Sequence, residues 1–282
     1  MAEASDMAIS RLDIDQKTRR TFFSLRVPLS IARVTFSEVL RDKVLAQILV
    51  LTALLFLVTL ITSQVSSRVS ERVLVDFSWG ALLISSLVLA VSQGAIALKR
   101  ELDRRTLFLV LARPIYRFQW YLGKFFGLGG IFTINVILFT LVTEFLFWLY
   151  LDPSTFTVPP TTRLSADFLL LMQALLVGAI AMFFSTMTSS SLSMALTFGL
   201  YLIGSSHSQI LWLSDQNQGA AREFIRLCSY LIPNFEGLHL SRYLTYGIAV
   251  DAPFLFSRVG YALLWCLIFL VLGGLRLRRK EF

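Results

Sequence analysis

Charged residues are scarce in this sequence of 282 residues, and their scarcity excludes a soluble domain. Asp, Glu, Lys and Arg make up 16% of the chain, whereas 56% of the residues are hydrophobic and the mean hydropathy is +0.70. Soluble domains carry about a quarter of their residues as charges. The composition therefore indicates a membrane protein.

Cysteine and histidine are also rare, which limits the chemistry that the chain can carry. The two cysteines, Cys228 and Cys266, lack the spacing of a metal site, so we expect neither a bound metal nor a disulfide framework. His207 lies in an apolar run and His239 on an amphipathic segment, and the candidate acid and base groups do not converge. An intramembrane enzyme needs converging catalytic groups, so we keep that class as the weakest alternative and expect no catalytic residue.

A phosphate-binding loop is absent as well. No G-x-x-x-x-G-K-[ST] motif occurs, and Gly123-Lys124 lacks both the upstream glycine and the following Ser or Thr. We expect this chain to bind no cofactor and not to hydrolyse ATP alone. A cleaved signal peptide is not expected either, because the start MAEASDMAISRLDIDQK is polar and mixed in charge.

Six apolar runs are long enough to cross a bilayer, which takes about 20 helical residues. Gly, Ser and Thr are scattered through them without the alternation that a membrane barrel needs, so we expect helices. The fold class predicted is an all-α integral membrane protein with one domain at 21–275, between a tail at 1–20 and a basic tail at 276–282. The predicted spans cover residues 44–65, 77–98, 125–151, 168–187, 192–213 and 254–275.

The Lys and Arg residues predict the orientation. Nineteen of the 26 lie before the first span, between the second and third spans, or after the sixth. Since cytoplasmic connections retain positive charge, we expect both termini in the cytoplasm and a multi-pass protein of the cytoplasmic membrane. The net charge of +8 then points to anionic lipid rather than nucleic acid as a partner.

Two amphipathic stretches flank the cytoplasmic borders. Apolar residues interrupted by arginines before the first span predict an interfacial helix at about 29–42, which Pro28 starts or kinks. The stretch 99–113 has Glu101 four residues before Arg105, an order that supports a helix. A solvated basic loop is the alternative, but the apolar face beside these charges favours docking against another protein.

The connections on the other side differ in character. Residues 152–167 carry three prolines and, like the short connection before the second span, are interpreted as a plain loop. Residues 218–248 contain two amphipathic half-length helices broken at Pro233. Each is too short to span, so we expect them at the outer interface.

Several short motifs occur in a fixed order along this six-span pattern. The cytoplasmic stretch has Glu-x-x-x-x-Thr-Leu, Arg-Pro-Ile and Gly-Lys, and the sequence Leu-Ile-Pro-Asn-Phe precedes the last span. Together with Phe36 in the interfacial segment and the basic end Arg-Arg-Lys-Glu-Phe, they make the chain resemble the membrane subunits of ABC-type-2 export systems. The resemblance covers nearly the whole chain.

This resemblance implies an exporter subunit that works with a second copy of itself or a related permease. Each copy would be bound by a separate ATPase subunit, which would hold ATP and Mg²⁺. A non-transporting mechanical subunit is the alternative, although the longest outer connection is only about 40 residues. The implied ATPase-coupling residues are Arg100, Glu101, Arg104, Arg105, Thr106, Leu107, Arg113 and Pro114. The other implied sites are Glu38, Arg41 and Asp42 in the interfacial helix and Pro233, Asn234 and Phe235 at an outer gate.

Three features inside the predicted spans leave alternatives open. Glu144 is the acidic residue deepest in a span; it either ties this span to the half-helices around Pro233 or marks the outer end of a translocation path. Gly123 and Gly127 form a small-xxx-small pair for dimer contact or for local packing. The methionines in the spans are interpreted as packing residues rather than soft-metal ligands.

Overall fold

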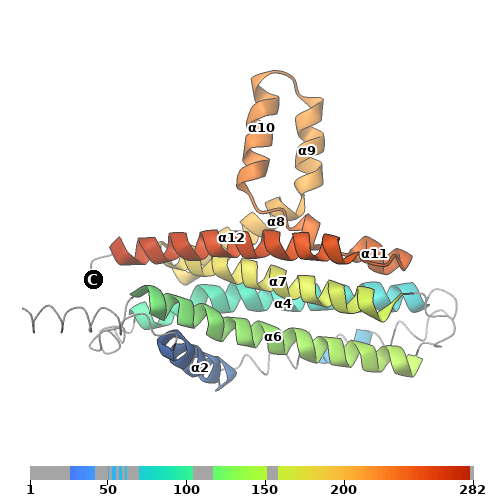
Figure 1. The fold of residues 1–282 in the computed structure, drawn as a ribbon, viewed down its shortest axis with the longest axis horizontal. Coiled ribbons are helices and arrows are strands. Elements are labelled where there is room, and N and C mark those ends of the chain that lie inside the picture. Colours follow the sequence, from blue (N-terminus) through green and yellow to red (C-terminus); the bar gives the residue numbers. More distant parts are fainter. Residues whose placement is uncertain are drawn as a thin grey trace, which may run out of the picture.

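The chain forms a bundle of long α-helices in the computed structural model, which describes residues 26–41, 70–103, 117–150 and 158–279 and a few positions between 50 and 61. Four helices are long and apolar enough to cross a membrane: α4 (Ser70–Asp103), α6 (Arg117–Tyr150), α7 (Pro160–Ser185) and α12 (Ala252–Arg279). They run side by side (Figure 1). No strand occurs among the described residues, and the prediction of an all-α membrane fold is confirmed.

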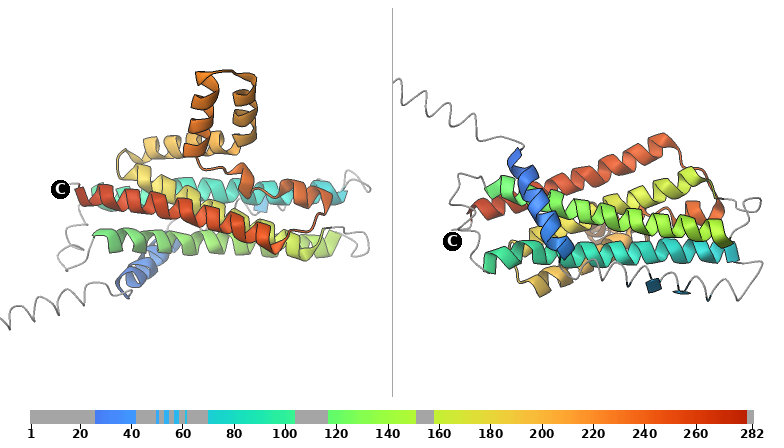
Figure 2. Two further views of the ribbon diagram at one scale, coloured as in Figure 1. Left: turned by 45° about the horizontal axis from the view of Figure 1, so that its top comes forward. Right: turned by 90° about the horizontal axis from the view of Figure 1, so that it is seen from below.

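Six shorter helices complete the described part of the chain. The predicted interfacial helix is α2, which lies across one end of the bundle (Figure 2). The hairpin α9–α10 projects sideways from the bundle (Figures 1 and 2). These shorter helices are α2 (Arg26–Arg41), α8 (Ser190–Ser205), α9 (His207–Gln216), α10 (Ala220–Leu231), the 3₁₀-helix η1 (Glu236–Leu238) and α11 (Ser241–Tyr246).

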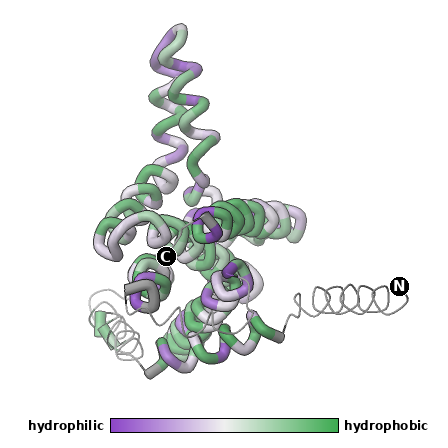
Figure 3. The backbone as a smooth tube through the Cα atoms, turned by 90° about the vertical axis from the view of Figure 1, so that its left-hand side faces the viewer, coloured by the Kyte–Doolittle hydropathy of each residue, from purple (hydrophilic) through white to green (hydrophobic). Residues whose placement is uncertain are grey.

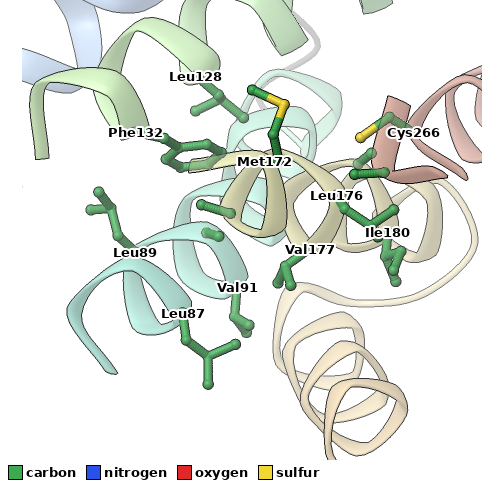
Figure 4. Packing of buried hydrophobic residues seen from close by; sticks show 14 of the residues in the cluster. Leu87, Leu89, Val91, Leu128, Phe132, Met172, Leu176, Val177, Ile180 and Cys266 are labelled. Carbon is green, nitrogen blue, oxygen red and sulfur yellow. The ribbon is translucent and has the colours of Figure 1, made fainter. Parts of the chain in front are cut away.

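Helix α7 lies at the centre of the bundle and contacts α4, α6, α8 and α12. Its buried side chains include Met172, Leu176 and Ile180, which pack against residues of α4, α6 and α12 such as Leu89, Phe132 and Cys266 (Figure 4). Met172 and Met182 are buried in this core and Met194 packs against it, as the packing interpretation predicts, whereas Met187 is exposed. The core therefore sits around α7, and the outer faces of α6 and α12 present exposed leucine, isoleucine and phenylalanine side chains.

Basic residues collect where α4 ends, α6 begins and α12 ends, and we call this part of the molecule the basic end. It holds Arg100 on α4, Lys124 on α6 and Arg276 on α12. Arg117 joins two of these helices by donating a hydrogen bond to the carbonyl oxygen of Leu277 at 3.3 Å. The opposite end is closed by α11, where Thr245 Oγ1 donates to Asp76 of α4 at 2.9 Å.

The start of α7 corrects one sequence prediction. Residues 160–167 were expected in a plain loop, but α7 begins at Pro160. Proline is well placed there because the first turn of a helix leaves its N–H groups without intrahelical acceptors and proline has a fixed φ suited to that turn. Reading the prolines only as loop markers missed about two helical turns at the opposite end.

The fifth predicted span, 192–213, is not one continuous helix. It is divided into α8 and α9 at Ser206, whose backbone has φ −102° and ψ 28°. The series of backbone hydrogen bonds within the helix is interrupted here. The Gly204 carbonyl accepts the N–H of Phe235 at 3.1 Å, while the N–H of Ser208 donates to the carboxylate of Glu236 at 2.7 Å. In an unbroken helix these two groups would bond to each other.

The gap between the helices is filled by the segment before the last span. Only glycine at position 204 allows this close approach, since a Cβ atom there would overlap the carbonyl oxygen of Pro233. Of the predicted half-helices, the first corresponds to α10 and the second to η1 and α11, with the break at Pro233 as predicted. The predicted first span, 44–65, lies almost entirely outside the described residues.

The hairpin α9–α10 has a polar tip that its own side chains hold together. Asp215 accepts hydrogen bonds from Arg222 at 3.2 Å and from Arg226 at 3.1 Å. Viewed along the bundle, the hairpin extends away from the other helices and carries hydrophilic residues at its far end (Figure 3). These ion pairs are partly exposed, so they orient the tip more than they stabilise it.

Candidate functional site

Two glycines of α6, Gly123 and Gly127, allow helix α2 to pack closely against α6. A Cβ atom at Gly123 would lie 2.7 Å from Cβ of Ile31, and one at Gly127 would lie 2.7 Å from Cβ of Thr35 and 2.8 Å from the carbonyl oxygen of Ala32. Real side chains essentially never make such contacts, so only glycine permits this approach. The small-xxx-small pair therefore serves local packing against the interfacial helix, one of the two alternatives left open by the sequence.

A cluster of three charges joins α2, α4 and α6 at the basic end, and we call Glu38, Arg100 and Lys124 the coupling cluster. One carboxylate oxygen of Glu38 lies 3.6 Å from Nζ of Lys124, and the other lies 4.0 Å from a guanidinium nitrogen of Arg100. The Lys124 side chain is 4% exposed, whereas that of Glu38 is 39% exposed. One carboxylate on the interfacial helix thus contacts two of the long helices at once.

The coupling cluster lies at the point where the predicted coupling stretch begins. Helix α4 continues without a break through Lys99, Arg100 and Glu101 to Asp103. The first residues of the stretch are therefore the end of a long helix rather than a separate short one. A displacement of this end would change the distance between Arg100 and Glu38.

The other predicted residues of this region cannot be placed. Glu101 lies within α4 and Arg41 is the last residue of α2, but the side chains of both lie outside the described set. Their proposed roles stay predictions. The same holds for a further group that falls wholly outside the described residues, namely Asp42, Arg104, Arg105, Thr106, Leu107, Arg113 and Pro114.

Glu144 forms an ion pair inside the bundle. Arg163 of α7 donates to both carboxylate oxygens through Nε and a terminal nitrogen, each at 2.7 Å, and its guanidinium also lies over the Phe147 ring at 5.5 Å. The Arg163 side chain is 11% exposed. The observed partner is thus the neighbouring helix α7, not the half-helices around Pro233 to which the sequence interpretation tied Glu144.

A second carboxylate lies one helical turn from Arg163. Asp167 accepts a hydrogen bond from Thr140 of α6 at 2.7 Å, so α6 and α7 exchange polar contacts in both directions. Sequence reasoning missed Arg163 and Asp167 because both were assigned to a loop. Their spacing of four residues, directly after Pro160, was the signal that places them on one helix face.

The predicted outer-gate motif joins two helices, α8 and α12. Phe235 is fully buried and its ring centroid lies 5.1 Å from that of Tyr201 on α8. The N–H of Asn234 donates to the hydroxyl of Tyr261 on α12 at 2.7 Å, and the Asn234 side chain accepts the N–H of Gly237 at 2.9 Å. The motif is therefore a packed joint between α8 and α12, and movement of it would move both helices.

A buried histidine lies beside this joint. The His239 ring meets Trp79 of α4 edge-on at 5.6 Å. Burial lowers the pKa of His239 to about 4, against the opposing attraction of Glu236. Burial would raise the pKa of Glu236 itself, but the hydrogen bonds from Ser208 and the nearby positive charges of His207 and Arg242 together hold it below its usual value.

The polar contacts described above link different helices of the bundle. Glu38 pairs with Lys124 and Arg100 at the basic end, and Arg163 pairs with Glu144 toward the opposite end. No group of three His, Cys, Asp or Glu side chains within these segments gathers in the way that a metal site requires.

The sequence matches a known family over most of its length. A comparison with curated proteins finds no match. The sequence model described as ABC-2 family transporter protein, however, matches residues 29–282, from the first turn of α2 to the end of the chain. Four apolar helices of spanning length are present in that range. The chain belongs to the ABC-2 family of transporter proteins and is a membrane subunit of that family.

Proposed function

We propose that this chain is the transmembrane subunit of an ATP-driven exporter and that a separate nucleotide-binding subunit docks at its basic end. The observation that carries the proposal is the coupling cluster. Glu38 connects the interfacial helix to α6 through Lys124 and to the end of α4 through Arg100. A partner that pushes on the chain after Arg100 would therefore move three helices together.

ATP and Mg²⁺ would be held by the partner, because this chain has no phosphate-binding loop. The basic end would face the cytoplasm, in accord with the positive-inside rule, and the chain would lie in the cytoplasmic membrane. A second copy, or a related permease, would complete the transport unit, as the family resemblance implies. The exposed apolar residues of α12, which include Leu263, Leu264 and Leu267, would supply surface for lipid or for such a copy.

The docking step can be tested by charge reversal. The double variant Glu101→Lys/Arg105→Glu keeps the net charge and should leave membrane insertion intact while the ATPase subunit no longer co-purifies. The matched control Lys280→Glu/Glu281→Lys reverses an adjacent pair at the basic C-terminal tail and should retain the partner. Affinity purification from the native membrane, with mass spectrometry of the retained proteins, measures both.

Either of two outcomes would contradict the proposal. One is the absence of any ABC-type ATPase from the purified native protein. The other is equal recovery of that ATPase with the unaltered chain and with the charge-reversed variant, which would return the stretch 99–113 to a solvated basic loop.

A further inference from the structure

A groove lies between α2 and α6 at the basic end, on the side away from the coupling cluster's contact with α4. Its volume is about 380 Å³. Ala32 and Gly127, both buried, form its floor, and Leu29, Phe36 and Phe126 form its apolar walls. The same glycine that seats α2 on α6 thus leaves a hollow beside the contact.

The walls of the groove are open to the surroundings of the protein. Leu29 is 72% exposed and Phe126 is 59% exposed. Both side chains line the groove, so its walls offer an apolar surface to a lipid acyl chain. Because α2 is the amphipathic interfacial helix, such an occupant would lie at the level where lipid acyl chains meet their headgroups.

One cation stands at the groove. Arg33 lines it, is exposed, and follows Leu29 by one helical turn, so both project from the same face of α2. Within the described residues, Arg33 forms no hydrogen bond or ion pair, unlike Arg100, which lies near Glu38. A guanidinium presents a planar fork of donors that matches a phosphate group.

We propose that this groove binds a single anionic phospholipid, with an acyl chain between Phe36 and Phe126 and the phosphate on Arg33. An amphiphile fits the combination of apolar walls and the Arg33 charge, which has no ion-pair partner among the described residues. A purely apolar protein segment would leave that charge without an anion. With the basic end in the cytoplasm, as proposed above, the surrounding leaflet is the anionic one, where each Lys or Arg near the surface contributes about 1 kcal/mol of attraction. The site is independent of whether the chain transports anything.

The consequence is a lipid dependence of the interfacial helix. Glu38 lies on α2 only five residues after Arg33, so a lipid that holds Arg33 also fixes the helix that carries the coupling cluster. Loss of anionic lipid would loosen α2 without removing any protein contact. The proposed lipid therefore acts as a positioning ligand rather than as cargo.

The test compares two lipids that differ only in charge. The delipidated protein in detergent is supplied with phosphatidylglycerol or with phosphatidylcholine of the same acyl chains, and its thermal unfolding is followed. Phosphatidylglycerol should raise the unfolding temperature more. Arg33→Gln should abolish the difference between the lipids, whereas Arg33→Lys should keep part of it and Arg276→Gln, a matched change of an exposed arginine on α12, should keep all of it.

Position is tested separately with a phosphatidylglycerol that carries a photoreactive diazirine in its acyl chain. The label should appear on peptides that contain Leu29 and Phe126 and should fall with Arg33→Gln. Equal stabilisation by both lipids would overturn the proposal. So would efficient disulfide formation between a cysteine at position 126 and one in the predicted first span or in a second copy, because protein would then fill the groove.

Discussion

Arg163 of α7 binds the carboxylate of Glu144 on α6 with two hydrogen bonds. Its two nitrogens each lie 2.7 Å from a carboxylate oxygen, and the geometry is the bidentate one that makes such pairs strong. A carboxylate held in this way is neutralised and fixed, which favours a structural link between α6 and α7. The pathway role of Glu144 stays a prediction, and transport by Glu144→Gln is the measurement that would reveal it.

The pair itself makes a prediction about stability. Arg163→Met should leave Glu144 without its cation and destabilise the protein by about 1–3 kcal/mol, less than for a fully buried pair because the Glu144 side chain is 36% exposed. The double variant Glu144→Leu/Arg163→Met removes both charges and should recover most of the loss. Thermal unfolding of the purified protein measures both. A double variant as unstable as the single one would show that the stability loss in Arg163→Met does not come from leaving Glu144 unpaired.

His239 makes a prediction about pH. Its pKa in the folded chain is about 4, below the ordinary value of 6.5, so the unfolded chain binds more protons between these limits. The stability contributed by neutral, buried His239 is therefore present above about pH 6.5 and declines as the pH falls toward 4. The unfolding temperature should drop between pH 7.5 and pH 5 in the unaltered chain, and less in His239→Phe. An equal drop in both proteins would assign the effect to other groups.

At the scale of helices, α2 can pack closely on α6 because glycine residues of α6 have no side chain at the contact. Gly127→Ala would place a Cβ atom 2.7 Å from Thr35 and 2.8 Å from the Ala32 carbonyl, so α2 has to move. Overpacking of this kind costs about 1–3 kcal/mol. The control is Gly199→Ala on α8, where nothing lies within 4 Å of the added atom and helix propensity favours alanine.

Gly127→Ala should lower both the unfolding temperature and the amount of ATPase subunit that co-purifies. Gly199→Ala should leave both unchanged or raise them. Equal behaviour of the two variants would mean that the close approach of α2 and α6 is unimportant for assembly. If less ATPase subunit co-purified while the unfolding temperature stayed the same, the position of α2 on α6 would matter for binding the partner rather than for the stability of this chain.

Most long helices could be predicted from the sequence because a bilayer demands about 20 apolar residues and the runs display them directly. The interfacial helix was predicted at 29–42 and observed at Arg26–Arg41, since arginines repeat through an apolar face. The start of α7 was missed because proline both ends and begins helices, and the residues around it do not say which. Local chemistry therefore placed the centres of the helices better than their ends.

The division between α8 and α9 could not be predicted from the sequence around Ser206. It depends on Phe235 and Glu236, which lie about 30 residues further along the chain and take over the backbone groups of Gly204 and Ser208. The coupling cluster has the same character, because Glu38 and Lys124 belong to segments 86 positions apart. Such pairings follow from the tertiary fold, so the residue types predicted a charged region but not its partners.

At the scale of the whole molecule, orientation is the first prediction. Ser37 on α2 and Ser241 on α11 are both exposed, at the basic end and the opposite end. With Cys228 and Cys266 replaced, a cysteine at position 241 should react with a membrane-impermeant reagent in intact cells, and one at position 37 should react only after the cells are opened. The reverse pattern would place the basic end outside and remove the docking surface for a cytoplasmic ATPase.

The central claim is that ATP use by a partner moves this chain through the coupling cluster. Glu38→Gln keeps the shape of the side chain but removes the charge that faces Lys124 and Arg100. Glu223→Gln, on the exposed surface of α10, is the matched control.

The most direct measurement is the labelling rate of a cysteine at position 241 in the reconstituted complex, with and without ATP. ATP should change the rate in the unaltered complex and in Glu223→Gln. Glu38→Gln should retain the partner yet show no change. An ATP response in Glu38→Gln equal to that of the unaltered complex, or no response in the unaltered complex itself, would contradict the account.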